Sequence, residues 1–258
     1  MSLRVVSHTC SNTEIVCALG CADLLVAVDS DSDFPPEVVG ALPQLGRDLA
    51  LDTEAVRALS PDLVLTSLTV PGHERVVDGL RDAGLRCLVI EPYSLHDVYR
   101  SIHDIAAALG VPARGTALVD GMEAAMPARP ARPDAPRVLV EWWPKPVIGA
   151  ARRSWVHDLI ERAGARNALD AQDAPTATPP TPPAADAIVM SWCGVQVENY
   201  RADVVLRREG WQEVAAIREA RVHAVSEAFL GRPGPRLVDG YRALRNLVER
   251  FHARTPAH

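Results

Sequence analysis

Imidazole, hydroxyl and thiol side chains follow the first β-rich segment of the sequence. Residues 4–8 read RVVSH, and Thr9 and Cys10 come directly after His8. A thiol and an imidazole this close could form a nucleophile and its base, or could bind zinc or copper together with His73. The sequence places no orienting third group or paired set of ligands beside them. A metal-dependent enzyme or sensor that uses His8 and Cys10 therefore stays an alternative interpretation.

The motifs of the common catalytic folds are missing from the sequence. No G-x-S-x-G elbow, phosphate-binding P-loop or G-x-G-x-x-G turn lies between a strand segment and a helix segment. We therefore expect a binding protein rather than an enzyme, and we expect no cofactor and no resident metal.

Tryptophan is concentrated at the ends of strand segments in the second half. Trp142 ends the segment 137–142 and Trp143 follows it, and Trp192 follows the segment 186–191. An indole ring hides roughly 150–250 Å² when it is covered, so these rings favour a flat organic or macrocyclic ligand. Because side chains alternate along a strand, one of Trp142 and Trp143 must point to the opposite side.

Strand and helix segments alternate through the first half. Apolar β-rich segments occupy residues 4–8, 24–28, 63–67 and 86–91. Between them, helical segments run from a capping box at 11–14 to Gly20, from 52 or 53 to 59, from 71 to 84, and from 94 to 109. Such alternation predicts βαβ units and a parallel sheet covered on both faces.

The second half repeats this organisation after a helical stretch at 113–126 and a proline-rich connector at 127–136. Strand segments follow at 137–142, 186–191 and 221–226, with helices at 155–164 and 236–253, whereas the proline-rich segment 174–185 reads as a surface loop. The segments SPDLVLTSL (60–68) and AADAIVMSW (184–192) share one local pattern. Two similar α/β halves predict two lobes with a cleft between them, and ligands of such sheets bind outside the carboxyl ends of the strands.

Composition limits the remaining choices. The 258 residues are 48% hydrophobic, and the net charge of −6 argues against a nucleic-acid-binding surface. There is no apolar run long enough to cross a membrane and no export signal at the start, which leaves a removed signal or a cytoplasmic protein as alternatives. Five cysteines without a CxxC pair predict no disulfide framework, and they fit a reducing compartment slightly better than an oxidising one.

Five segments in order carry a family resemblance: RVVSHTCSNTEIVCALG, DSDSDFPPEV, LDTEAVRALSPDLVL, GHERVVDGL and RPGPRLVDGYRAL. Together they resemble the cobalamin- and iron-siderophore-type substrate-binding proteins of ABC importers, over nearly the whole chain. The resemblance implies two Rossmann-like lobes with mainly parallel sheets, bridged by a single long helix. We accordingly expect an N-terminal lobe at 1–111, a bridging helix at 112–130 and a C-terminal lobe at 131–258.

The pattern is closest to the cobalamin-binding members, so cobalamin or a related corrinoid is the first expected ligand, with haem or a ferric siderophore as alternatives. Leu68 stands where these members carry an aromatic residue that clamps the ligand. The residues expected to bind the ligand are His8, Thr9, Cys10, Ser30, Asp31, Arg47, Leu68, Val70, Trp142, Trp143, Trp155, Trp192, Phe229 and Arg232.

The resemblance also implies a partner and a location. In the family, one acidic residue on each lobe docks onto arginines of the permease. Glu74 falls on the first position, whereas Gly231 occupies the second and leaves Glu227 as the substitute. We expect a monomer that acts in the periplasm or at the outer face of a membrane.

Overall fold

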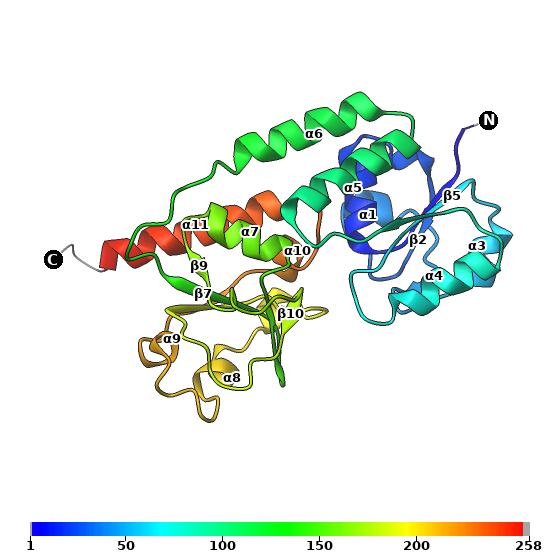
Figure 1. The fold of residues 1–258 in the computed structure, drawn as a ribbon. Coiled ribbons are helices and arrows are strands. Elements are labelled where there is room, and N and C mark those ends of the chain that lie inside the picture. The colour runs from blue at the N-terminus through cyan, green and yellow to red at the C-terminus, as the bar shows by residue number, and fades with distance from the viewer. Residues whose placement is uncertain (1, 255–258) are drawn as a thin grey trace. The chain divides into compact units, whose positions relative to one another are not determined.

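The computed structural model describes residues 2–254 and divides them into two compact units. Unit 1 holds residues 2–92 and 97–121, and unit 2 holds residues 93–96 and 122–254. Each unit is an α/β structure built around one main sheet (Figure 1). The predicted helical stretch is α6 (Pro112–Ala125), and the chain passes from unit 1 to unit 2 within it. The predicted domain limits themselves stay a prediction.

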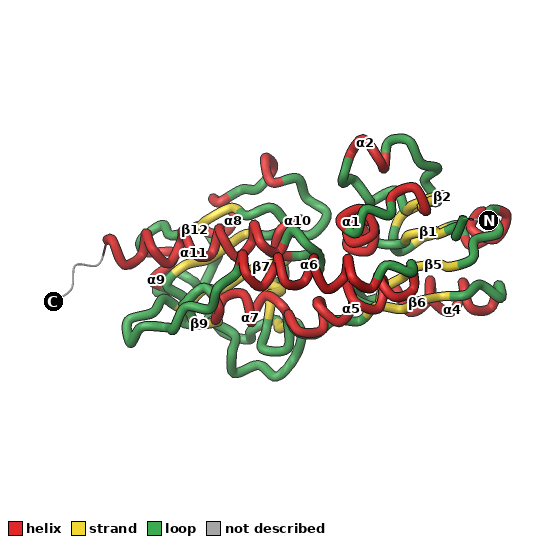
Figure 2. Tube along the Cα trace, turned by 90° about the horizontal axis from the view of Figure 1, so that it is seen from above, coloured by secondary structure: helices red, strands yellow, loops and turns green. Residues whose placement is uncertain are grey.

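The main sheet of unit 1 has four parallel strands in the order β2-β1-β5-β6 (Figure 2). Its strands are β1 (Val5–Ser7), β2 (Leu25–Val28), β5 (Leu63–Ser67) and β6 (Cys87–Ile90), all within the predicted segments. Its helices are α1 (Cys10–Ala18), η1 (Ala22–Leu24), α2 (Pro36–Val39), α3 (Thr53–Ala58), α4 (His73–Asp82) and most of α5 (Leu95–Ala108). A short hairpin of β3 (Gly46–Arg47) and β4 (Ala50–Leu51) follows α2.

Both faces of this sheet are buried. Val6 and Val64 pack with Val56 of α3 and Leu80 of α4 in one buried cluster. Their neighbours Val5, Leu63 and Leu65 are also buried, and they must face the other side of the sheet because successive side chains of a strand alternate. This explains why each strand reads as a continuous apolar run.

The sheet of unit 2 is mixed. Its order is β10-β8-β7-β11-β12, with β9 beside β7. The strands are β7 (Arg137–Pro144), β8 (Val147–Ala150), β9 (Arg166–Asn167), β10 (Thr176–Ala177), β11 (Ala187–Met190) and β12 (Val222–Ala224). The helices are α7 (Trp155–Arg162), η2 (Val197–Asn199), α8 (Ala202–Leu206), α9 (Ala215–Arg218), α10 (Glu227–Leu230) and α11 (Leu237–Arg254). Strands β7, β11 and β12 are parallel, whereas β8 returns antiparallel to β7.

The local pattern shared by residues 60–68 and 184–192 has a structural meaning. Asp62 accepts a hydrogen bond from the backbone N–H of Arg4 over 2.8 Å. Asp186 accepts the same bond from Arg137 over 2.9 Å. In each unit, an aspartate before one central strand therefore secures the start of the neighbouring central strand.

Two expectations about local structure are wrong. Ser11–Glu14 does not open the first helix, because α1 starts at Cys10 and its N-cap, Thr9, makes no side-chain capping bond. Ser11 and Glu14 are buried within the helix instead. The proline-rich segment 174–185 is not entirely loop, since Thr176 and Ala177 pair with β8.

Candidate functional site

The turn between β1 and α1 has a strained backbone that polar groups hold in place. Thr9 occupies it with φ 80° and ψ 140°, a conformation that a β-branched residue adopts only under restraint. The backbone N–H of Thr9 donates to Asp29 Oδ2 over 2.8 Å, and its hydroxyl lies 3.1 Å from that of Ser67. The ends of β1, β2 and β5 are thereby joined through polar groups.

Asp29, the first residue after β2, is fully buried and accepts four hydrogen bonds. Besides Thr9, the donors are the backbone N–H of Asp31 at 2.9 Å, and the N–H and hydroxyl of Ser32 at 3.0 and 2.8 Å. Burial raises the pKa of Asp29, while these hydrogen bonds and the nearby His8 oppose that effect.

The β3–β4 hairpin is attached to the same strand end. Asp31 accepts the backbone N–H of Asp48 over 2.9 Å and forms a 2.8 Å ion pair with Arg47. Leu49, at the tip, is 43% exposed. The predicted ligand residues Asp31 and Arg47 are therefore in direct contact with one another.

His8 is buried among these loops. One ring nitrogen, Nε2, lies 2.7 Å from the backbone oxygen of Asp48, and the other, Nδ1, lies 2.7 Å from Thr66 Oγ1. Burial lowers the pKa of His8 below its ordinary value of 6.5. The ring of His73 lies 5.2 Å away, and its Nε2 is 3.6 Å from Asp48 Oδ2. Interaction with His73 in turn lowers the pKa of Asp48.

This cluster does not resemble a metal centre. The described residues contain no group of three or more His, Cys, Asp and Glu side chains placed to hold a metal ion. The thiol of Cys10 donates to the backbone oxygen of Asp31 over 2.9 Å. The metal-site alternative therefore gains no support from the geometry.

A second buried carboxylate lies where the central strands of unit 2 end. Glu141 accepts a 3.0 Å hydrogen bond from the indole of Trp192 and lies 2.8 Å from the guanidinium of Arg208. The Arg208 guanidinium also lies over the ring of Trp211, 4.5 Å from its centroid. Burial raises the pKa of Glu141, while Arg208 and Trp192 oppose that effect.

The tryptophan pair at the end of β7 divides between core and surface, as strand alternation requires. Trp142 is buried with its ring 5.7 Å from that of Trp155, whereas Trp143 is 42% exposed. The indole N–H of Trp143 donates to the backbone oxygen of Lys145 over 3.1 Å, which holds the ring beside its own hairpin turn. Trp155 and Trp192 are also buried.

The two predicted docking residues lie in different settings. Glu74 is exposed at the start of α4 and accepts the backbone N–H of Gly72 over 2.8 Å. Glu227 is largely buried and forms 2.8 Å contacts with Arg232. Burial and this ion pair leave Glu227 less available to an outside partner than Glu74.

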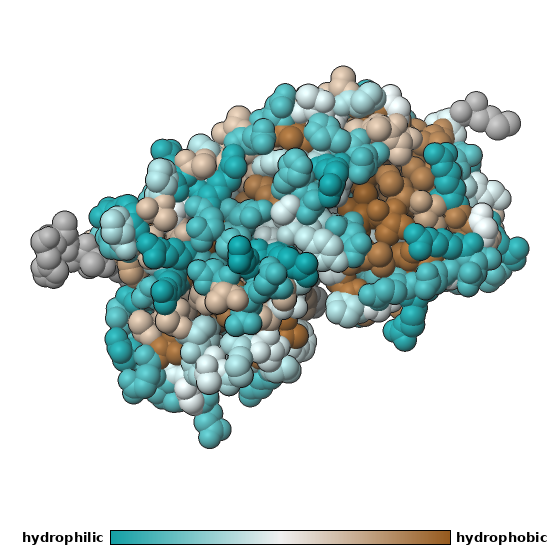
Figure 3. Space-filling view, in the orientation of Figure 1, coloured by the Kyte–Doolittle hydropathy of each residue, from teal (hydrophilic) through white to brown (hydrophobic). Residues whose placement is uncertain are grey.

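Exposed hydrophobic side chains follow strands in both units. Among the described residues, the large hydrophobic side chains with the greatest exposure are Phe34, Leu49, Val70, Tyr93 and Trp143, each at 40–43%. Phe34 comes after β2, Leu49 between β3 and β4, Val70 after β5, Tyr93 after β6, and Trp143 at the end of β7. Figure 3 also shows hydrophobic side chains gathered over unit 1 where Figure 1 labels α1, β2 and β5.

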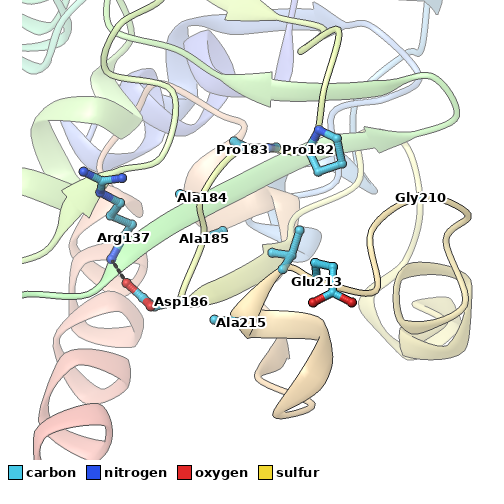
Figure 4. A pocket seen from close by; sticks show the side chains of 10 residues that line it. Arg137, Pro182, Pro183, Ala184, Ala185, Asp186, Gly210, Glu213 and Ala215 are labelled. Atoms are coloured by element: carbon cyan, nitrogen blue, oxygen red, sulfur yellow. Dashed lines mark hydrogen bonds between the residues drawn. The ribbon is translucent and has the colours of Figure 1, made fainter.

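A pocket of about 630 Å³ in unit 2 lies away from these strand ends. It is lined by Arg137, Asp186 and Glu213, with part of the proline-rich segment (Figure 4). Arg137 begins β7 and Asp186 precedes β11, so the pocket sits at the amino ends of the parallel strands. Ligands of parallel sheets bind at the carboxyl ends of the strands, so this pocket is on the wrong side of the sheet for such a ligand.

The polar strand ends and two α/β units agree with one known family. A family model described as "Periplasmic binding protein" matches residues 5–228. The chain belongs to the periplasmic binding protein family. This membership makes it a binding protein rather than an enzyme, as the sequence predicted.

Individual relatives cover nearly all of this periplasmic binding protein. The uncharacterised ABC transporter substrate-binding lipoprotein YvrC of Bacillus subtilis is 30% identical over 95% of this chain and 79% of its own. A vitamin B12-binding protein of Vibrio parahaemolyticus is 24% identical over 97% and 90%. The periplasmic heme-binding protein RhuT of Roseiflexus sp. RS-1, in apo form, is 27% identical, covers 96% and 100%, and has a TM-score of 0.76.

Within this periplasmic binding protein, the predicted ligand residues fall into two groups. In unit 1, His8, Thr9, Cys10, Ser30, Asp31, Arg47, Leu68 and Val70 all lie at or beyond the carboxyl ends of strands or on the attached hairpin. In unit 2, Trp142, Trp143 and Trp192 lie at strand ends, Phe229 is in α10, Arg232 follows it, and Trp155 begins α7. Their role in binding stays a prediction.

Sequence reasoning missed the buried groups that hold these loops. Asp29, Thr66 and Ser67 were passed over in unit 1, as were Glu141 and Arg208 in unit 2. A carboxylate directly after or within an apolar strand is a usable signal for Asp29 and Glu141, because a buried charge requires partners. Arg208 lies far from Glu141 in sequence and carries no such signal.

Proposed function

We propose that this periplasmic binding protein captures cobalamin or a related corrinoid at its strand ends and delivers it to the permease of an ABC importer. The observation that carries the proposal is the exposure of large hydrophobic side chains in segments that follow strands or lie at a strand end, namely Phe34, Leu49, Val70, Tyr93 and Trp143. Exposed apolar area is costly in water unless a ligand covers it. A large, flat and partly apolar ligand fits this pattern better than a small polar solute.

The energetic contribution of one such ring is modest. A tryptophan offers roughly 150–250 Å² of surface, and Trp143 retains 42% of its exposure. Covering this exposed part of the ring with a ligand would gain about 2 kcal/mol before the costs of association. Several apolar residues must therefore act together with polar groups such as Arg47 to give tight binding.

The relatives support the class of ligand. The protein of Vibrio parahaemolyticus is named a vitamin B12-binding protein, and it aligns over most of this chain. RhuT, named as a heme-binding protein, is 27% identical and makes haem the second candidate. The word lipoprotein in the name of YvrC supports action at the outer face of a membrane. None of the helices in the described part of the chain is long and apolar enough to span a membrane.

Ligand titration tests the proposal. Calorimetry with cyanocobalamin, cobinamide, hemin and a ferric siderophore should give one-to-one binding of the corrinoids, and desalted protein should retain their visible absorption. Retention of hemin alone would transfer the assignment to the second candidate. Binding of none of the four would refute the proposal.

Delivery to a permease has its own test. We propose that exposed Glu74 contributes to docking in unit 1, and that Glu227 contributes only if its ion pair with Arg232 opens. Glu74→Gln should slow uptake into vesicles that contain the permease and leave ligand affinity unchanged, with exposed Glu54→Gln as the matched control. Equal uptake by wild type and Glu74→Gln would remove Glu74 from the docking surface.

A further inference from the structure

We infer that Asp29 is a positioning residue at the carboxyl ends of the unit 1 strands, where the ligand is proposed to bind. It holds the strained turn at Thr9 and orients Asp31 toward the β3–β4 hairpin. Asp29 itself is fully buried, so it acts through the residues that it holds and not by touching ligand. The part of this inference that concerns binding rests on the proposed function, whereas the structural part does not.

The first step is the division of donors between the two carboxylate oxygens. Oδ2 accepts the N–H of Thr9 and the hydroxyl of Ser32, each at 2.8 Å. Oδ1 accepts the N–H groups of Asp31 and Ser32, at 2.9 and 3.0 Å. An ionised carboxylate satisfies all four because it only accepts. Asparagine would turn an NH₂ group toward one pair of these donors. The less costly orientation faces Thr9 and Ser32, because the Ser32 hydroxyl can accept from the NH₂ group, and it loses the bond from the Thr9 N–H.

The second step is the strain at Thr9. Its dihedral angles lie in a region that glycine occupies easily and a β-branched residue does not. Strain of this kind persists only when neighbouring groups restrain the backbone. The 2.8 Å bond from the Thr9 N–H to Asp29 Oδ2 is the backbone restraint, and it fixes where α1 begins.

The third step leads from Asp29 to the exposed hairpin. The Asp29 carboxylate shapes the turn at Asp31 and Ser32, and Asp31 then accepts the N–H of Asp48 and pairs with Arg47. The hairpin carries Leu49, one of the exposed hydrophobic residues. Loss of the Asp29 carboxylate should therefore loosen two separate segments, the start of α1 and the hairpin, which are far apart in sequence.

Hydrogen exchange on the full chain tests this without any ligand. In Asp29→Asn, amide exchange in residues 8–14, 29–34 and 46–51 should rise at least about tenfold, because bonds to a charged group are lost. Asp62→Asn is the matched control, since Asp62 also accepts a backbone N–H but lies at the amino ends of the strands. It should leave these three segments unchanged. Unchanged exchange in Asp29→Asn, or an equal rise in both variants, would overturn the inference.

A pair of substitutions at Thr9 separates positioning from general destabilisation. Thr9→Gly and Thr9→Ala both remove the hydroxyl, but only glycine relieves the strained backbone. Asp29→Asn combined with Thr9→Gly should recover slow exchange at residues 8–14, whereas the combination with Thr9→Ala should not. If Asp29→Asn does not fold, Thr9→Gly alone must still be more resistant to urea than Thr9→Ala. The reverse order would contradict the strained-turn account.

Binding supplies the last readout. Asp29→Asn should weaken whichever of cyanocobalamin and hemin the wild type binds, and adding Thr9→Gly should restore part of the affinity. If wild type binds neither probe, the proposed function fails while the exchange result still decides the role of Asp29. If Asp29→Asn changes exchange but not affinity, Asp29 is not a positioning residue for ligand.

Discussion

Nε2 of His8 lies 2.7 Å from the backbone carbonyl oxygen of Asp48, and this contact determines the state of the ring. A carbonyl oxygen only accepts hydrogen bonds, so Nε2 carries the proton. In the neutral ring, Nδ1 then accepts from the hydroxyl of Thr66 at 2.7 Å. Protonation of Nδ1 would reverse that bond, with Thr66 as the acceptor, and place a positive charge in a buried site, where desolvation opposes it. Neutral His8 is therefore part of what fixes the hairpin to the strand ends.

The stability of unit 1 should fall on acidification. The pKa of His8 is lowered below 6.5 in the native state, so native His8 binds fewer protons than His8 of the unfolded chain as the pH falls below about 6.5. The stabilisation is present above that pH and is lost as the pH falls through the lowered pKa. This loss of stability can be measured by hydrogen exchange in α4 and β5 between pH 7.5 and 5, corrected for intrinsic rates.

The variant His8→Gln should flatten this pH dependence, whereas exposed His103→Gln should not. The groups that face His8 are Thr66, Asp48, Asp29 and His73. Asp29 has a raised pKa and contributes the opposite slope, and His8 partly opposes that raise, so the difference between wild type and His8→Gln reports His8 together with its effect on Asp29. Identical pH profiles for these two proteins would show that His8 does not carry the effect.

Gly240 should not tolerate a methyl group. A Cβ at this position of α11 would meet the backbone oxygen of Phe229 and lie 2.7 Å from Leu230 Cδ2. Gly240→Ala should lower the unfolding free energy by about 1–3 kcal/mol through overpacking, measured by urea denaturation. Gly79→Ala in α4 is the control, because its nearest atom would be 3.5 Å away, and it should be neutral or stabilising.

Much of the fold could be predicted from the sequence because both sheets bury central strands. Residues 63–67 form β5 as predicted, and Gly20, Gly84 and Gly110 follow helix ends with positive φ. The antiparallel strand β8 could not be predicted, because VIGA is a short run that follows a Lys145-Pro146 turn. The start of α1 was misplaced because a long-range bond to Asp29, not a local cap, decides it.

The candidate site was predicted less well, for a related reason. The sequence showed which loops follow strands, so His8, Asp31 and Trp143 were placed correctly at or after strand ends, while their role in binding stays a prediction. It did not show that Asp29 and Glu141 are buried and bonded to residues from other loops. Such partners are set by tertiary contacts and have no fixed spacing along the chain.

The adjacent tryptophans Trp142 and Trp143 should separate stability from binding. Trp142→Ala should cost about 3–5 kcal/mol of unfolding free energy, because the ring is buried beside Trp155. Trp143→Ala should leave stability nearly unchanged and weaken binding of cyanocobalamin or hemin, since its exposed ring is available to a ligand. Calorimetry and urea denaturation measure the two effects. Unaltered affinity in Trp143→Ala would remove this residue from the ligand site.

Breaking the buried ion pair between Arg208 and Glu141 should destabilise unit 2. Arg208→Ala would leave the buried Glu141 carboxylate without its cation, which typically costs about 3–5 kcal/mol. Arg201→Ala is the control, because its pair with Asp203 is largely exposed and is worth about 0–1 kcal/mol.

All five tryptophans lie between residues 142 and 211, within unit 2, so indole fluorescence during urea denaturation follows this unit selectively. The pKa of Glu141 is already raised by burial, and loss of Arg208 should raise it further. The Arg208→Ala defect should therefore shrink as the pH falls and the carboxyl becomes neutral. A defect of the same size at pH 5 and pH 8 would mean that lost packing on Trp211, rather than the uncompensated charge, accounts for the cost.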